Sequence, residues 1–270
     1  MSAVTAHPAA DVVVGVRVHA VGMAAAVEAV MTWVRAAGPP RVAVGVNAYV
    51  CTMAAKDVAF SDLLDRADLA YADGQSVVWA ARLLGLAVPE RVATTDLLLP
   101  LARACAEQGA RVFMLGGAPG VAALAAAALR ERVPGLAVAT ADGFEDLADE
   151  QSLLARIDEH GTDVLLVGLG DPLQQVWADR FRAATAVPAI LTCGGLFDWA
   201  SGRHRRAPAW MIRAGLEWAW RLMIEPRRLA RRYLVGNVDF LARLGAQLVV
   251  RTLRGRVRSS RQQSGSSANP

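Results

Sequence analysis

The chain has 270 residues, of which 54% are hydrophobic and 20% are charged, and its formal net charge is +4. A chain this long and apolar can bury a large core, which excludes an intrinsically disordered protein and favours one large α/β domain, alone or with an appendage. The three cysteines, Cys51, Cys105 and Cys193, lie too far apart in the sequence to suggest a metal site or a disulfide framework, so we expect no metal and a reducing, cytoplasmic environment.

After a flexible leader, expected over residues 1–10 and without a signal-peptide pattern, six apolar runs predict the strands of one sheet. They are "RVAVGVNAYV" (41–50), "ADLAYA" (67–72), "RVFMLGG" (111–117), "LAVATADG" (136–143), "DVLLVGLG" (163–170) and "PAILTCGG" (188–195). Most are continuous rather than alternating, which is typical of strands buried on both faces. Helical patterns follow at 75–85, 95–108, 119–132, 147–160 and 173–184. This alternation predicts a Rossmann-like α/β core over residues 11–202, with a mostly parallel sheet and helices on both faces.

Residues 203–254 differ in composition and are expected to form a basic helical appendage. Pro208 precedes an aromatic-rich helical pattern, and Pro226 opens a second one. Residues 203–261 contain 15 arginines and three acidic residues, whereas the rest of the chain has more acidic than basic residues. Such a segregated charge implies an anionic partner: a nucleic acid, a phosphorylated ligand or a lipid surface. We expect residues 255–270 to be a disordered tail, and no run predicts a transmembrane helix.

Polar side chains follow several predicted strands at their carboxyl ends, which is where open α/β sheets bind ligands. Asn47 interrupts the first apolar run, and because a buried amide needs hydrogen-bond partners, a structural role and a ligand contact are equally open. Gln174 lies in the first turn of the helix after "VGLGDP". It either satisfies the end of that helix or hydrogen-bonds a sugar or base.

Asp73, in "YADGQ", has two interpretations. Aspartate is a preferred helix N-cap and Asp-Gly is ordinary turn chemistry, so the local residues alone favour a cap. The alternative is a general base, because a partly desolvated carboxylate at a strand end can accept a proton from a sugar hydroxyl.

Two further stretches are candidates for phosphate binding. Gly116 and Gly117 lie between an apolar run and an Ala-rich helix, where free N–H groups suit a phosphate, although a tight turn is the commoner explanation. In the appendage, Arg221, Arg228 and Arg231 lie close in sequence, and the last two are neighbours on one helical face. They form either a diphosphate clamp or a solvated basic face at a membrane surface.

Taken together, these stretches resemble the WecG/TagA/CpsF proteins, glycosyltransferase family 26, over residues 42–240. The resemblance is carried by "VNAYV", "ADLAYADGQSVVWAARLLG", "ERVATTDLLLPLARAC", "RVFMLGGAPGVAALAAAAL", "VPGLAV", "VGLGDPLQQVW" and "GGLFDWASGRHRRAPAWMIRAGLEWAWRLMIEPRRLARRYL". Seven such elements in the right order and spacing are highly specific.

The resemblance implies a bacterial enzyme that works at the inner face of the cytoplasmic membrane. Such enzymes move a sugar from a UDP-sugar to a lipid-diphosphate-linked sugar, with inversion and without metal or cofactor, in the synthesis of teichoic acid, common antigen or exopolysaccharide. Carried over by position, Asp73 matches the general base. The positions implied to bind substrate are Asn47, Gln174, Arg221, Arg228 and Arg231. We therefore expect a UDP-sugar donor, a lipid-linked acceptor and an anionic membrane surface as partners, and no nucleic acid, while self-association into a homo-oligomer stays open.

The sequence departs from the family pattern at three positions. Gly45 replaces a usual threonine near the sugar, which leaves the identity of the donor open. Gln175 replaces a usual glutamate and Thr94 a usual glycine, and both changes look tolerable.

The alternative from another functional class is a nucleic-acid-binding or scaffold protein that uses the arginine-rich segment. It would not need Asn47, Asp73 and Gln174 at strand ends that converge on one cleft. A nicotinamide-dependent enzyme is disfavoured because the G-x-G-x-x-G fingerprint is missing.

Overall fold

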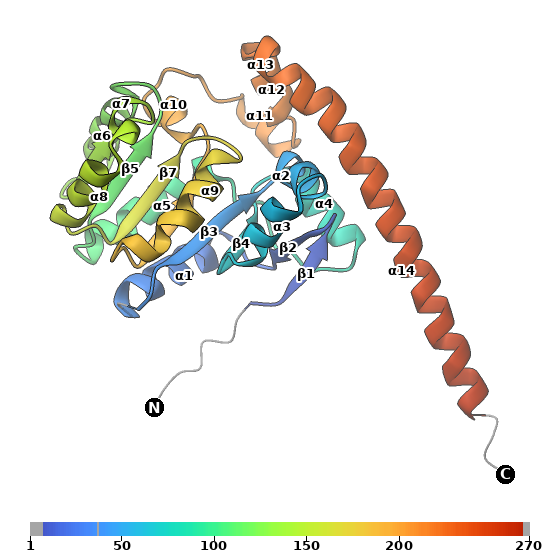
Figure 1. Ribbon diagram of the computed structural model, residues 1–270. Helices are drawn as coiled ribbons and strands as arrows, with labels where there is room; N and C mark the ends of the chain where they lie inside the picture. Colours follow the sequence, from blue (N-terminus) through green and yellow to red (C-terminus); the bar gives the residue numbers. More distant parts are fainter. Residues whose placement is uncertain (1–7, 37, 267–270) are drawn as a thin grey trace.

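The computed structural model describes the backbone of residues 8–36 and 38–266, and side chains through residue 253 except those of residues 37 and 228. Its centre is a six-stranded sheet in the order β4-β3-β8-β7-β5-β6, in which every neighbouring pair is parallel (Figure 1). The strands are β3 (Arg41–Val46), β4 (Leu69–Ala72), β5 (Val112–Gly116), β6 (Val138–Ala141), β7 (Val164–Gly168) and β8 (Ala189–Thr192). The predicted parallel α/β fold is confirmed.

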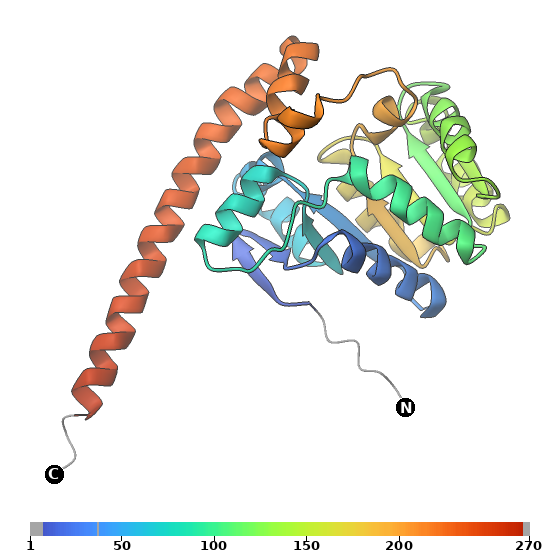
Figure 2. The same cartoon turned by 180° about the vertical axis from the view of Figure 1, so that it is seen from behind.

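Helices cover both faces of the sheet, as Figures 1 and 2 show from opposite sides. On one face lie α1 (Met23–Ala36), α5 (Thr94–Glu107), α6 (Val121–Arg132) and α10 (Leu196–Ala200). On the other lie α2 (Ala48–Ala54), α3 (Val58–Asp65), α4 (Gln75–Leu83), α7 (Glu145–Ala148), α8 (Glu150–Glu159) and α9 (Leu173–Phe181), the last followed by η1 (Arg182–Ala184). Successive strand residues alternate between the two apolar cores, so Ala43 packs in one and Val44 in the other. This double burial explains the continuous apolar runs.

An antiparallel hairpin, β1 (Ala10–Val13) and β2 (Val16–His19), precedes the sheet. Val14 and Gly15 form its two-residue turn, and both have positive φ, 49° and 83°. Such turns match the twist of the flanking strands, but they are disfavoured for a β-branched residue, so the sequence pattern did not predict this one. Of the expected leader, residues 1–7 lie outside the described residues.

The appendage is divided more finely than the sequence predicts. The first predicted helix is two, α11 (Ala209–Arg213) and α12 (Glu217–Ile224), because the chain turns at Gly215, whose φ is 72°. The second runs through α13 (Pro226–Ala230), a π-helical turn η2 (Arg231–Val235) and α14 (Gly236–Ser266). The backbone of α14 continues to Ser266, into the segment 255–270 that the sequence predicts to be a disordered tail; residues 267–270 lie outside the described residues.

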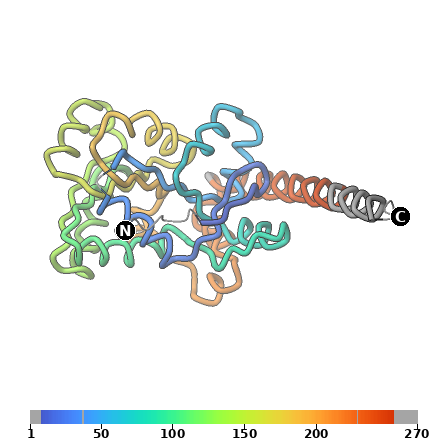
Figure 3. The backbone as a smooth tube through the Cα atoms, turned by 90° about the horizontal axis from the view of Figure 1, so that it is seen from below, coloured from blue at the N-terminus to red at the C-terminus, as the bar shows by residue number. Residues whose placement is uncertain are grey.

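The start of α14 belongs to the core, and its far part does not. Phe240 and Leu244 are buried in the same apolar cluster as α2, and Gln247 Oε1 accepts from Val14 N at 2.8 Å. Arg251 also contacts the body, through Leu84 O and the carboxylate of Asp11, while the helix as a whole points away from the sheet domain (Figure 3). Within the described residues, no helix is both long and apolar enough to cross a membrane.

Candidate active site

A cavity of about 340 Å³ lies between the carboxyl ends of β3, β4, β7 and β8 and the helices of the appendage. The register of β3 on β4 pairs Val46 with Ala72, so that Asn47 and Asp73 emerge side by side. Thr192 ends β8 in the same wall, and its buried hydroxyl has no hydrogen-bond partner among the described residues. The appendage contributes Gly215, Glu217, Trp218, Arg221, Arg232 and Tyr233 to the lining. The cavity is therefore formed jointly by core and appendage.

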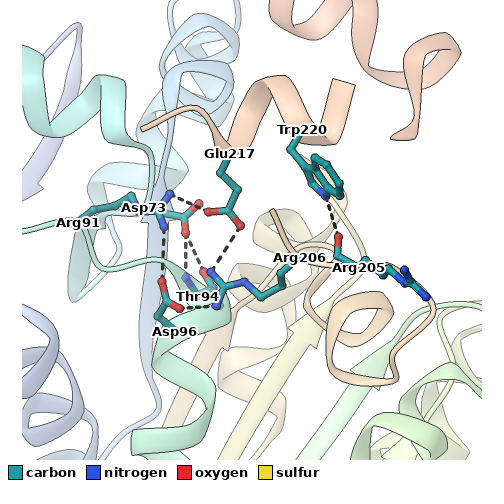
Figure 4. A network of polar contacts seen from close by, with 8 residues as sticks. All are labelled: Asp73, Arg91, Thr94, Asp96, Arg205, Arg206, Glu217 and Trp220. Atoms are coloured by element: carbon teal, nitrogen blue, oxygen red, sulfur yellow. Dashed lines mark hydrogen bonds and ion pairs between the residues drawn. The ribbon is translucent and has the colours of Figure 1, made fainter. Parts of the chain in front are cut away.

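Asp73 is held by the start of α5 rather than by its own helix. Its Oδ1 accepts from Thr94 N at 2.9 Å and from Thr94 Oγ1 at 3.2 Å (Figure 4). The N-cap of α4 is Gly74, without a side-chain bond, so the expectation that Asp73 caps the helix that follows it is wrong. In the described structure Asp73 Oδ2 forms no hydrogen bond, which leaves one oxygen fixed and the other available to the cavity.

The environment of Asp73 raises the pKa of its carboxyl group above the usual value. Burial is the largest cause, and the hydrogen bond from Thr94 N and the charges of Arg91 and Arg221 oppose it. A carboxylate with a raised pKa is a stronger base than an exposed one, as proton abstraction requires.

Two glycines allow the polar strand ends to approach one another. A Cβ on Gly74 would lie 3.0 Å from Asn47 Cβ, and a Cβ on Gly45 would lie 3.1 Å from Asp73 Cβ. Gly45 would also meet the ring of Tyr71 at 3.3 Å, so this tyrosine partly fills the space that a side chain at 45 would need. Because glycine has no side chain, these two positions leave room for Asp73 beside Asn47.

Asn47 ends β3 rather than interrupting a longer strand. Its Oδ1 accepts from Tyr49 N at 3.0 Å and from Val50 N at 3.1 Å, which caps α2. Its Nδ2 group forms no hydrogen bond within the described residues and belongs to the cavity lining. The amide oxygen therefore has a structural role, and a ligand contact by the amide nitrogen stays a prediction.

Gln174 is 4% exposed, and both ends of its amide are bonded within the protein. Its Oε1 accepts from Gly194 N at 2.7 Å, and its Nε2 donates to Asp171 Oδ1 at 2.7 Å. Gln175 Nε2 donates to the same Asp171 oxygen, also at 2.7 Å. The structure brings Gln174 to the cavity, where it joins the loops after β7 and β8.

Of the three predicted appendage arginines, the structure brings Arg221 to the cavity. Arg221 lines the cavity, with its guanidinium carbon 5.6 Å from the ring centre of Trp199, and it forms no ion pair in the described part of the chain. The side chain of Arg228 lies outside what the structure describes, and Arg231 is exposed and outside the cavity lining.

The sequence predicted Arg231 as a substrate-binding residue, but its neighbour Arg232 lines the cavity instead. Its Nη2 lies 3.3 Å from Asp171 Oδ2 and 3.5 Å from Asn47 Oδ1, and its guanidinium carbon is 4.4 Å from the ring centre of Tyr49. Arg232 lies three residues after Leu229, which is buried, so the two share the face of the helix that meets the core, whereas Arg231 lies on the exposed side.

A closed ring of four ion-paired side chains lies beside Asp73 and was not predicted. Arg91 Nη1 lies 2.9 Å from Glu217 Oε2, and Arg91 Nη2 lies 3.5 Å from Asp96 Oδ2 (Figure 4). Arg206 completes the ring through Asp96 at 2.5 Å and Glu217 at 3.5 Å. Glu217 is the residue in the sequence that could have indicated this ring, since acidic residues are rare in the arginine-rich segment.

The structure does not bring Gly116 and Gly117 to this cavity. A Cβ on Gly116 would lie 2.3 Å from Gly168 O, and Gly117 N already donates to that oxygen at 3.3 Å. The close approach of β5 to β7 accounts for Gly116, while Gly117 has a φ of 75° and a Cβ there would lie 3.2 Å from Val121 Cβ. The structure thus gives both glycines a packing role, and phosphate binding by them stays a prediction.

The comparison with protein families agrees with this geometry. The model described as "Glycosyl transferase WecG/TagA/CpsF family" matches residues 12–254, which include the sheet, the cavity and the start of α14. The family implies glycosyl transfer in cell-surface polysaccharide synthesis, with a sugar-nucleotide donor and a lipid-linked acceptor in general terms. The chain belongs to the WecG/TagA/CpsF family of glycosyl transferases.

Proposed function

We propose that the protein is an inverting, metal-independent glycosyltransferase. It moves a sugar, N-acetylmannosamine or a related hexose, from a UDP-sugar to a polyprenyl-diphosphate-linked sugar. The observation that carries the proposal is the state of Asp73, with one oxygen fixed by Thr94 and the other unbonded in the shared cavity. Family membership supports the reaction class.

In the proposed mechanism Asp73 acts as the general base. Its Oδ2 takes the proton of an acceptor hydroxyl as that oxygen attacks the anomeric carbon from the face opposite UDP. The new C–O bond forms while the bond to the β-phosphate oxygen breaks, and the electron pair of that bond leaves with UDP. The configuration at the anomeric carbon is inverted, and the proton ends on Asp73.

Arg221 is the proposed counter-charge for the departing diphosphate. A guanidinium matches phosphate oxygens with paired N–H donors, and inside a cavity it stabilises developing negative charge without reorganising. Because Arg221 forms no ion pair among the described residues, it needs no displacement before it meets a phosphate. Asn47 Nδ2 and the Thr192 hydroxyl are further donors for the sugar.

The appendage is the proposed site of contact with the inner face of the cytoplasmic membrane. Its exposed apolar side chains include Trp210, Met223, Leu234 and Val238. Arg213, Arg227 and Arg231 are also exposed on helices of the appendage. A mixed apolar and cationic surface suits a peripheral protein on anionic lipid, where each basic residue contributes about 1 kcal/mol. Such docking would bring the cavity to a lipid-linked acceptor.

The test is a screen of UDP-sugars against a short-chain polyprenyl-diphosphate-GlcNAc acceptor, with release of UDP as the readout and EDTA present throughout. One UDP-sugar should support acceptor-dependent release that EDTA does not reduce. A control without acceptor measures hydrolysis of the donor.

Release that requires a divalent cation would contradict the metal-independent mechanism. Absence of transfer from every donor, together with salt-sensitive binding to any duplex, would favour a nucleic-acid-binding protein.

A further inference from the structure

Arg91 lies between two carboxylates and close to a third. Its side chain is 13% exposed, and its direct partner Glu217 is 12% exposed, so this ion pair is shielded from water. Asp96 binds the other side of the guanidinium at 3.5 Å. The third carboxylate is Asp73, whose protonation Arg91 influences through its charge although no hydrogen bond joins them.

Few charged or titratable groups face Asp73 in the described structure. Arg91 precedes α5, Arg221 comes from α12, and Tyr71 lies two residues earlier on β4. Glu217 itself faces Arg91 and Arg206. A guanidinium prefers a paired contact with a carboxylate, so Glu217, Asp96 and Asp73 compete for Arg91.

We propose that Glu217 is a positioning residue for glycosyl transfer: it holds Arg91 on the appendage side and so leaves Asp73 Oδ2 unpaired for the acceptor's proton. The inference rests on the proposed role of Asp73 as the base. Without the Glu217 carboxylate, Arg91 has one fewer acidic partner and turns to Asp73. The resulting ion pair would occupy the oxygen that takes the proton.

The position of Glu217 in the chain gives this contact a second consequence. Glu217 and Arg221 lie four residues apart on α12 and therefore on one face of that helix. The docking of α12 that brings Arg221 to the cavity also brings Glu217 to Arg91. One short helix thus supplies the counter-charge for the leaving group and the group that keeps the base unpaired.

The test is Glu217→Gln, which keeps the shape of the side chain and removes its charge. The acidic limb of the kcat–pH profile should move down by about 1 pH unit, as an uncompensated neighbouring cation lowers a carboxyl pKa. The kcat on the plateau should fall about 10-fold, because a paired, weaker base accepts a proton less readily. Carbon-13 NMR of labelled aspartates, assigned with Asp73→Asn, should show the same shift of Asp73 without turnover.

Arg206→Gln is the matched control, because it opens the ring on its far side and leaves the Arg91–Glu217 pair in place. Its acidic limb should not move to lower pH. The double variant Arg91→Met/Glu217→Leu removes both charges. Because the charge of Arg91 lowers the pKa of Asp73, the acidic limb of this variant's kcat–pH profile should move to higher pH. That variant keeps the test informative if Glu217→Gln folds poorly.

An unchanged limb in Glu217→Gln, or the same downward shift in Arg206→Gln, would overturn the positioning role and leave the transfer reaction intact. A change confined to the KM for the donor would assign Glu217 a purely structural role. Failure of the proposed function looks different: wild-type protein without transfer, or Asp73→Asn with normal turnover.

Discussion

The position of Asp73 depends on side chains that are absent as much as on those present. Gly45 and Gly74 let the ends of β3 and β4 approach, and Thr94 then fixes one carboxylate oxygen. The sequence alone made Asp73 and Asn47 candidates because they follow apolar strands at the edge where open α/β sheets bind ligands. It could not identify Thr94 as the partner, since that contact crosses from β4 to α5 and no local pattern encodes it.

Gly45→Ala should displace Asp73, because the added Cβ would lie 3.1 Å from Asp73 Cβ. We expect kcat to fall about 10- to 100-fold, as small misplacements of catalytic groups do, and overpacking to cost about 1 to 3 kcal/mol of unfolding free energy. Steady-state kinetics and urea unfolding measure the two effects. Gly245→Ala, which faces open space on α14, is the control and should keep full activity. Normal kcat in Gly45→Ala would contradict the account of how Asp73 is placed.

The pH dependence of stability should reveal the buried carboxyl of Asp73. Its raised pKa means that the folded protein keeps this proton at pH values where the unfolded chain, with a value near 3.8, has lost it. The contribution of Asp73 to the free energy of unfolding therefore falls as the pH rises from its pKa in the unfolded chain through its pKa in the folded protein. Asp73→Asn, which cannot ionise, should be more stable than wild type at pH 7.5, and the difference should disappear below about pH 4. Urea unfolding across pH measures it, and a difference that grows toward acid would contradict the burial effect.

At the scale of elements, the strands of the sheet were predictable and several other features were not. The six apolar runs contain β3 to β8, because burial on both faces leaves a strong apolar signal. The hairpin β1–β2 and helix α1 were not predicted, since the turn uses Val14 in an unfavourable conformation and α1 has no cap signal. The π-helical turn η2 was also not predicted.

Arg232→Met should loosen the docking of α13 and η2 on the core, because Arg232 contacts Asp171, Asn47 and Tyr49. Hydrogen exchange of the η2 amides should become about 10-fold faster, equal to the loss of roughly one charge-assisted hydrogen bond. Arg231→Met is the matched control from the adjacent position and should leave exchange unchanged. Equal acceleration in both variants would mean that the contacts of Arg232 do not hold η2 on the core.

At the scale of the whole molecule, the appendage has two surfaces with different roles. Its inner surface closes the cavity through Glu217, Arg221 and Arg232, and Phe240 anchors it in the core. Its outer surface exposes apolar and basic side chains, and the far part of α14 extends beyond the body (Figure 3). The sequence predicted a basic appendage, but not that the start of α14 would pack in the core.

Binding to lipid vesicles should depend on the outer surface of the appendage. The protein should co-sediment with vesicles that contain phosphatidylglycerol, and binding should weaken as salt screens the arginines. Leu234→Glu/Val238→Glu should reduce binding about 10-fold or more, because it places charge on exposed apolar positions. Val58→Glu, an exposed apolar position on α3 of the core, is the control. An equal loss of vesicle binding in the appendage variant and in Val58→Glu would mean that the lipid contact lies elsewhere.

The central claim is that Asp73 takes the acceptor's proton, and the turnover of Asp73→Asn tests it most directly. Asparagine keeps the size of the side chain and the oxygen that accepts from Thr94, but it cannot act as a base at neutral pH. With the donor and acceptor identified by the screen, the account predicts a folded variant that binds the UDP-sugar with little change and transfers it at least about 100-fold more slowly. A folded Asp73→Asn protein with wild-type kcat would contradict the account.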